Sequence, residues 1–101
     1  MNTVGEILRG LRDSKQLLLR EVAAELKMDT ALLSKIERNE RKPNKAQIMA
    51  FARFYQADPN ELLVAWLSDK IASDIQNEEL AKRVLKEAEK KVDLLKKSNK
   101  K

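Results

Sequence analysis

Two short segments with apolar residues at helical spacing follow one another in the first half of the chain. They cover about residues 19–26 and 30–38, and only residues 27–29 separate them. Asp29 is suited to cap the second segment, because its carboxylate can accept from free backbone N–H groups. The pattern therefore predicts two helices joined by a three-residue turn. Their apolar faces are made by Val22, Ala23, Leu26, Leu33 and Ile36.

The rest of the chain also shows helical spacing and no strand pattern. No alternation of apolar and polar residues exceeds four positions, and no Asn-Gly or Asp-Gly hairpin turn occurs. Thr3 and Glu6 have capping-box spacing, which predicts a first helix from about Thr3 to Ser14. Cap residues also predict helices from Asn44 to Tyr55, from Asp58-Pro59 to Ile75, and from Asn77 to Leu95.

These elements predict an all-α fold, with a five-helix domain followed by a C-terminal helical extension. The chain has 101 residues, too few for two ordinary domains. We expect the five-helix domain over residues 1–65, the extension over 66–97 and a disordered tail over 98–101.

Composition excludes several kinds of chemistry and favours an anionic partner. With no His and no Cys, the chain lacks disulfides, Cys/His zinc sites, thiol nucleophiles and imidazole acid-base catalysis. We therefore expect no enzyme activity, no metal and no cofactor. Because 101 residues leave no room for a separate ligand-sensing domain, we also expect no small-molecule ligand. A net charge of +5 makes nucleic acid a more reasonable partner than a membrane. No signal peptide or membrane-spanning stretch is evident, so we expect a cytoplasmic protein.

Two helices joined by a three-residue turn have the spacing of a DNA-reading helix-turn-helix. Ala23 is small enough for close packing, and Leu33 and Ile36 anchor the second helix. The exposed face of that helix would meet the bases, and donors that follow it would hold the phosphates. The base-contact candidates are Thr30, Ala31, Ser34 and Lys35, and the phosphate-contact candidates are Arg38, Asn39, Arg41 and Lys42.

The residues from Glu21 to Leu26 and from Leu32 to Pro43 resemble the Cro/lambda-repressor, or XRE-type, family of transcriptional regulators. The resemblance covers about residues 4–63. It implies a lambda-repressor-like domain that acts as a repressor or controller protein, with its third helix in the major groove of double-stranded DNA. It also implies base contacts from Thr30, Ala31 and Lys35, with Ser34 near a base or phosphate.

Three positions depart from the family pattern. Leu18 replaces the usual Ser or Thr cap, and Lys27 stands where the family often has Gly. Leu19 replaces a phosphate-binding Gln, so the phosphate contact expected there is left to the helix backbone.

We expect Arg9 and Arg12 to be solvated, and Glu37 to be a structural ion-pair partner rather than a base reader.

The C-terminal helices leave two interpretations open. Trp66 is either a core residue or an interface anchor, and the stripe from Ala81 to Leu95 either folds back on the preceding helix or packs on a second copy. We favour a homodimer on a palindromic operator, with dimer contacts from Trp66, Leu85, Ala88 and Val92. The alternative is a protein-binding module, such as an antitoxin or a phage-type adaptor, that acts through these helices.

Overall fold

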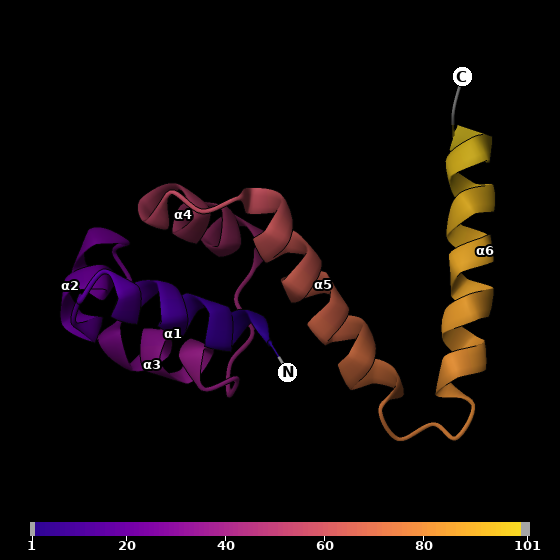
Figure 1. The fold of residues 1–101 in the computed structure, drawn as a ribbon, viewed down its shortest axis with the longest axis horizontal. Coiled ribbons are helices and arrows are strands. Elements are labelled where there is room, and N and C mark those ends of the chain that lie inside the picture. Colours follow the sequence, from indigo (N-terminus) through magenta and orange to yellow (C-terminus); the bar gives the residue numbers. More distant parts are fainter. Residues whose placement is uncertain (1, 100–101) are drawn as a thin grey trace. The chain divides into compact units, whose positions relative to one another are not determined.

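The structure, a computed structural model, describes residues 2–99 and is all-α as the sequence predicts (Figure 1). Two compact units divide the chain, Met1–Lys70 and Ile71–Lys101, and each is described by itself. Within the described residues the helices are α1 (Val4–Ser14), α2 (Leu19–Glu25), α3 (Thr30–Glu37), α4 (Lys45–Tyr55), α5 (Pro59–Ile75) and α6 (Ala81–Asn99).

Side-chain caps begin α1, α3 and α4 where the sequence predicts them. The Thr3 hydroxyl accepts from the Glu6 backbone N–H, and the Glu6 carboxylate accepts from the Thr3 N–H, which completes a capping box. The Asp29 carboxylate accepts from the Ala31 N–H at 3.1 Å. Asn44 and Gln47 form a second reciprocal box at 2.8 Å. These caps satisfy N–H groups that have no partner inside their own helices.

Non-glycine residues in the left-handed conformation lie at the ends of the helices or just after them. Asn39 has φ of 64° just after α3, and Asn is the non-glycine residue best suited to this conformation at a helix end. Lys27 has φ of 53° in the turn between α2 and α3, the place where the resembling family often has Gly. A lysine is strained in this region of φ, so the turn is held by the packing on either side of it.

The hydrophobic core lies in the first unit and comes from all five of its helices. In the first unit α3 packs against α1 and α2, and α1 also packs against α4. The Val4 backbone N–H at the start of α1 donates to the Asp69 carboxylate of α5 at 2.8 Å. The buried apolar residues are Val4, Leu8, Val22, Ala23, Leu33, Ile36, Ile48, Phe51, Ala52, Tyr55, Leu62, Ala65 and Trp66.

The sixth helix begins later than the sequence predicts. We expected it to start at Asn77, but α6 begins at Ala81 because turn hydrogen bonds come first. The Glu78 N–H donates to the Ile75 carbonyl, and the Ala81 N–H donates to the Glu78 carbonyl. Residues 98 and 99 of the predicted tail belong to α6, and residues 100 and 101 lie outside the described residues.

No described helix is both long enough and apolar enough to cross a membrane.

Gly5 sets how closely α1 approaches the end of α3. A Cβ atom at Gly5 would meet the Ile36 carbonyl oxygen, the Glu37 carbonyl oxygen at 2.8 Å and the Asn39 Oδ1 at 2.6 Å. Two of these are backbone atoms, which cannot turn aside. The glycine therefore lets the two helices lie in close contact.

We expect Gly5→Ala to lower the free energy of unfolding by about 1–3 kcal/mol, because the added methyl group would force α1 away from α3. Gly10→Ala in the same helix is the matched control, since a Cβ there has no neighbour within 4 Å. It should raise stability by about 0.5–1 kcal/mol through helix propensity. Urea denaturation of both variants measures the difference, and equal stabilities would contradict the contact.

Candidate nucleic-acid interface

Helix α3 has one buried face and one exposed face. Leu33 and Ile36 are 0% and 1% exposed and anchor the helix in the core. Thr30, Ala31 and Lys35 lie exposed on the other face, and Ser34 is half-buried beside them. The four predicted base-contact residues therefore come from the side of α3 that the core leaves uncovered.

A buried ion pair joins the end of α3 to α1. The Glu37 carboxylate accepts from Arg12 Nε at 2.8 Å and from Arg12 Nη2 at 3.0 Å, and its side chain is only 4% exposed. Arg12 Nη1 also donates to the Leu17 carbonyl at 2.9 Å. The prediction that Glu37 is an ion-pair partner is confirmed. The prediction that Arg12 is solvated is wrong, because its guanidinium satisfies a buried carboxylate instead.

The charges of this pair affect a neighbouring phenol. Burial raises the pKa of Tyr55 to about 12, and the nearby Glu37 carboxylate adds to the rise. The hydrogen bond to Glu37 raises the pKa of Arg12, so the guanidinium stays charged. The Tyr55 hydroxyl is buried and has no hydrogen-bond partner among the described residues. Tyr55 is therefore a neutral core residue near the ion pair over the physiological pH range.

The loop after α3 carries the predicted phosphate donors. Arg38, Asn39, Arg41 and Lys42 are all exposed. Arg38 Nε donates to the Ser34 carbonyl at 3.3 Å and lies 3.2 Å from Glu40 Oε2, so this side chain is held along the helix end. Within residues 2–99, neither Arg41 nor Lys42 forms an ion pair, which leaves both cations open to an anion.

Trp66 fixes the far end of this loop. Its indole Nε1–H donates to the Pro43 carbonyl at 2.8 Å, and Lys70 Nζ lies 3.8 Å from the centre of its ring. Trp66 is 7% exposed, so almost none of its surface is left for a partner subunit. Of our two interpretations the structure favours the core residue, and the predicted dimer contact from Trp66 is dropped. Helical spacing could not predict this hydrogen bond, because Pro43 lies 23 residues away from Trp66.

The start of α2 lacks the polar side chains that the family pattern places at residues 18 and 19. Leu18 has no cap acceptor, and its N–H donates to the Glu21 carboxylate at 2.8 Å. Leu19 is the first residue of α2, and its side chain packs against the core. Of the two leucines that replace the family's polar residues, Leu19 extends the core, whereas Leu18 is 48% exposed.

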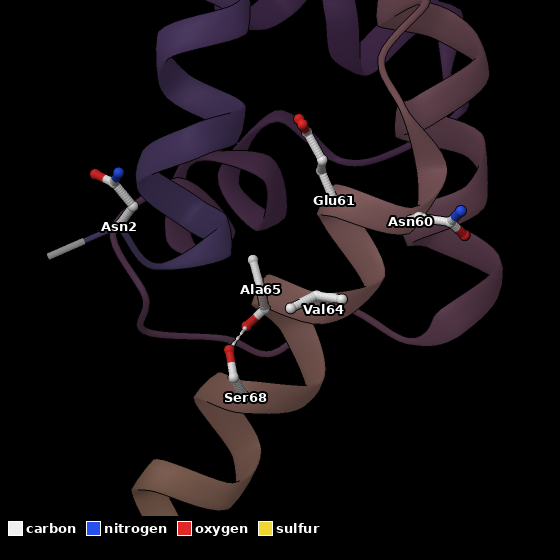
Figure 2. Close-up of a pocket in the computed structure, with 6 residues that line it drawn as sticks. All are labelled: Asn2, Asn60, Glu61, Val64, Ala65 and Ser68. Carbon is white, nitrogen blue, oxygen red and sulfur yellow. Dashed lines mark hydrogen bonds between the residues drawn. The ribbon is translucent and has the colours of Figure 1, made fainter.

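A shallow hollow of about 470 Å³ lies in the first unit, at the start of the chain and along α5 (Figure 2). Its lining includes exposed Val64 and the Glu61 carboxylate, and Ser68 donates to the Ala65 carbonyl at 3.1 Å. Among the described residues that line it there is no cationic side chain and none of the predicted DNA-contact residues. A carboxylate without a neighbouring cation does not suit phosphate, so this hollow is not a candidate DNA site.

The remaining predicted site residues belong to the second unit. Leu85, Ala88 and Val92 lie exposed on α6.

Comparison with known families identifies the first unit. Residues 3–65, well over half the chain, match the model of a helix-turn-helix domain family. The chain therefore belongs to the helix-turn-helix domain family of XRE/Cro-like proteins, and the resemblance stated from the sequence is confirmed. This is a family of DNA-binding domains rather than of enzymes. Neither the search of curated proteins nor the search of solved structures found a match.

We expect Arg12→Met to lower the free energy of unfolding by about 3–5 kcal/mol, because it leaves the Glu37 carboxylate buried without a cation. Replacing both partners, as in R12M with E37L, should recover most of this loss, since no charge then remains buried. Circular dichroism during urea denaturation measures both effects. A loss below about 1 kcal/mol for R12M, the range of a surface pair, would contradict a supporting role.

Proposed function

We propose that the chain is a sequence-specific transcriptional regulator that inserts α3 into the major groove of double-stranded DNA and acts as a homodimer on a palindromic operator. The observation that carries this proposal is the two-faced α3. Its exposed residues are small or polar, and its buried face and the Arg12–Glu37 pair hold it rigidly. A rigid helix with an accessible polar face suits the width of the major groove.

The chemistry of the exposed face favours a few direct base contacts. Lys35 can donate to O6 or N7 of guanine, and the methyl groups of Thr30 and Ala31 can contact a thymine methyl. Ser34 adds a hydroxyl that can bond a base or a phosphate. With one cation on this face, specificity also depends on DNA shape and on the spacing of two half-sites.

The loop after α3 supplies the contacts that place the helix on the DNA. Arg41 and Lys42 are exposed cations that follow the recognition helix. Phosphate contacts of this kind set register and orientation and carry no base information. Arg38 shares its charge with Glu40, so we assign it a weaker phosphate contact than its neighbours.

A homodimer matches the symmetry of such a site. Two copies of α3 would lie about 34 Å apart, one turn of DNA, so that each reads one half of the palindrome. The exposed apolar residues of α6 favour this assembly, because an amphipathic helix needs a partner for its apolar face. The same exposed face supports the second candidate function, a protein-binding module such as an antitoxin or adaptor.

Selection from random duplex DNA, followed by gel-shift assays, tests the proposal. We expect a two-fold symmetric motif to be enriched. Failure to enrich any motif would contradict sequence-specific binding. Tight binding to another protein that needs Leu85 but not Lys35 would instead support the protein-binding module.

Two sets of variants separate base reading from phosphate binding. R41A with K42A should weaken binding to all sequences alike and reduce the slope of log K against log salt by about 2. K35A should change the base preference at one position of each half-site. The binding free energy that favours the preferred base there should fall by about 1–3 kcal/mol.

Arg9→Ala is the control, because Arg9 is an exposed cation of α1 that faces Asp13 at 3.9 Å. It should leave affinity, salt slope and motif unchanged. If K35A shifted no position of the motif, the assignment of Lys35 as a base reader would be overturned.

A further inference from the structure

Four apolar residues of α6 form a stripe along one face of the helix, and Leu95 continues it toward the C-terminal end. Ala81, Leu85, Ala88 and Val92 follow one another at intervals of four, three and four residues, which places them on the same face. Leu85 is 44% and Val92 48% exposed, and α6 has no buried residue. The stability of a helix in water comes mostly from packing its apolar face. We therefore expect another apolar surface to cover this stripe.

We propose that the α6 stripe pairs with the same stripe of a second copy of the chain, with the two helices antiparallel. In this register Leu85 faces Ala88 of the partner subunit, and Ala81 faces Val92 of the partner subunit. The inference rests on the proposed homodimer and specifies its interface. Each pairing occurs twice, because a two-fold axis relates the two helices midway between residues 86 and 87.

The sizes of the stripe residues favour the antiparallel arrangement. Small alanines alternate with larger Leu85 and Val92 along the stripe. Antiparallel pairing sets a large residue against a small one in each of the four layers, so the side chains interdigitate at constant helix spacing. Parallel pairing would set alanine against alanine and leucine against leucine, which leaves gaps beside crowded layers.

The flanking charges favour the same register. Lys82 and Glu89 lie on one edge of the stripe, seven residues apart. In the antiparallel register Lys82 lies beside Glu89 of the partner subunit, and the symmetry repeats this attraction. On the other edge Val84 lies beside the Lys91 stem of the partner subunit, where an aliphatic chain covers an apolar residue.

The competing arrangements place like charges together. A parallel pair brings Lys91 beside Lys96 of the partner subunit on both sides. An antiparallel pair shifted by one layer, with Ala88 facing Val92 of the partner subunit, brings each Glu89 against its own copy and each Lys82 against Lys96. Like charges at these flanking positions disfavour a coiled-coil pairing.

This self-complementarity identifies a second copy as the occupant. A contact between identical surfaces requires that residue i meets j and that j meets i, a condition the stripe meets in both size and charge. A different protein would impose no such symmetry on α6.

Disulfide trapping tests the register directly, since the chain has no native cysteine. The variants are Ala81→Cys and Val92→Cys in the full chain, oxidised separately and as a mixture. Positions 81 and 92 are eleven residues apart, about 16 Å along the helix, and a disulfide needs Cα atoms within about 7 Å. We expect a covalent dimer in the mixture and none with either variant by itself.

Two other outcomes would overturn the proposal. A covalent dimer within each separate variant would indicate parallel helices, and no covalent dimer in any sample would remove this interface. Gel-shift assays on the reduced variants keep the proposed function separate. If the variants bind DNA but form no disulfide, only the α6 interface is contradicted. If the disulfide forms but the reduced variants do not bind DNA, only the proposed function is contradicted.

Charge reversal gives an independent test by sedimentation equilibrium. Lys82→Glu and Glu89→Lys should each weaken self-association about tenfold, because each replaces two attractions with two repulsions. The double variant should restore wild-type association. Lys86→Glu makes the same charge change on the outer face of α6 and should have little effect. Failure of the double variant to recover would overturn the Lys82–Glu89 contact.

Discussion

The pair formed by Arg12 and Glu37 is the contact on which the placement of α3 depends. Glu37 ends α3, and its buried carboxylate has both oxygens bonded to the Arg12 guanidinium of α1. The same guanidinium holds the Leu17 carbonyl just before α2. One side chain thus ties together α1, the approach to α2 and the end of α3. The close contact at Gly5 lets α1 reach α3 at this point.

In this arrangement the residues that anchor α3 differ from the residues on its exposed face. Leu33, Ile36 and Glu37 face inward, so changes at Thr30, Ala31 or Lys35 do not disturb the core. The loop that follows is fixed at its far end by the hydrogen bond from Trp66 to Pro43. Arg41 and Lys42, the proposed phosphate donors, therefore lie on a loop whose two ends are both fixed. Such preorganisation lowers the conformational entropy lost on binding.

Local patterns predicted much of the fold. The caps at Thr3, Asp29 and Asn44 depend on neighbours a few residues away, so their residue types and spacing were sufficient. The start of α6 was misplaced because Asn77 and Glu78 form turns with the end of α5 rather than a cap.

Contacts between distant residues could not be predicted in the same way. Arg12 and Glu37 lie 25 residues apart, and Trp66 meets Pro43 across 23 residues. One signal was present: Glu37 follows Leu33 by four residues and so shares its buried face. A carboxylate there requires a buried cation, but spacing does not say which of several basic residues supplies it. The exposure of Lys35, Arg41 and Lys42 was easier to predict, because it follows from the helical period and from their position in the loop.

Amide chemical-shift mapping by NMR distinguishes DNA binding through α3 from DNA binding elsewhere on the chain. The isotope-labelled chain would be titrated with a DNA duplex selected from random sequence. We expect the largest shifts at Thr30, Ala31, Ser34 and Lys35 and in the loop over residues 38–42. Shifts confined to α6, with α3 unchanged at saturating DNA, would contradict DNA binding through α3.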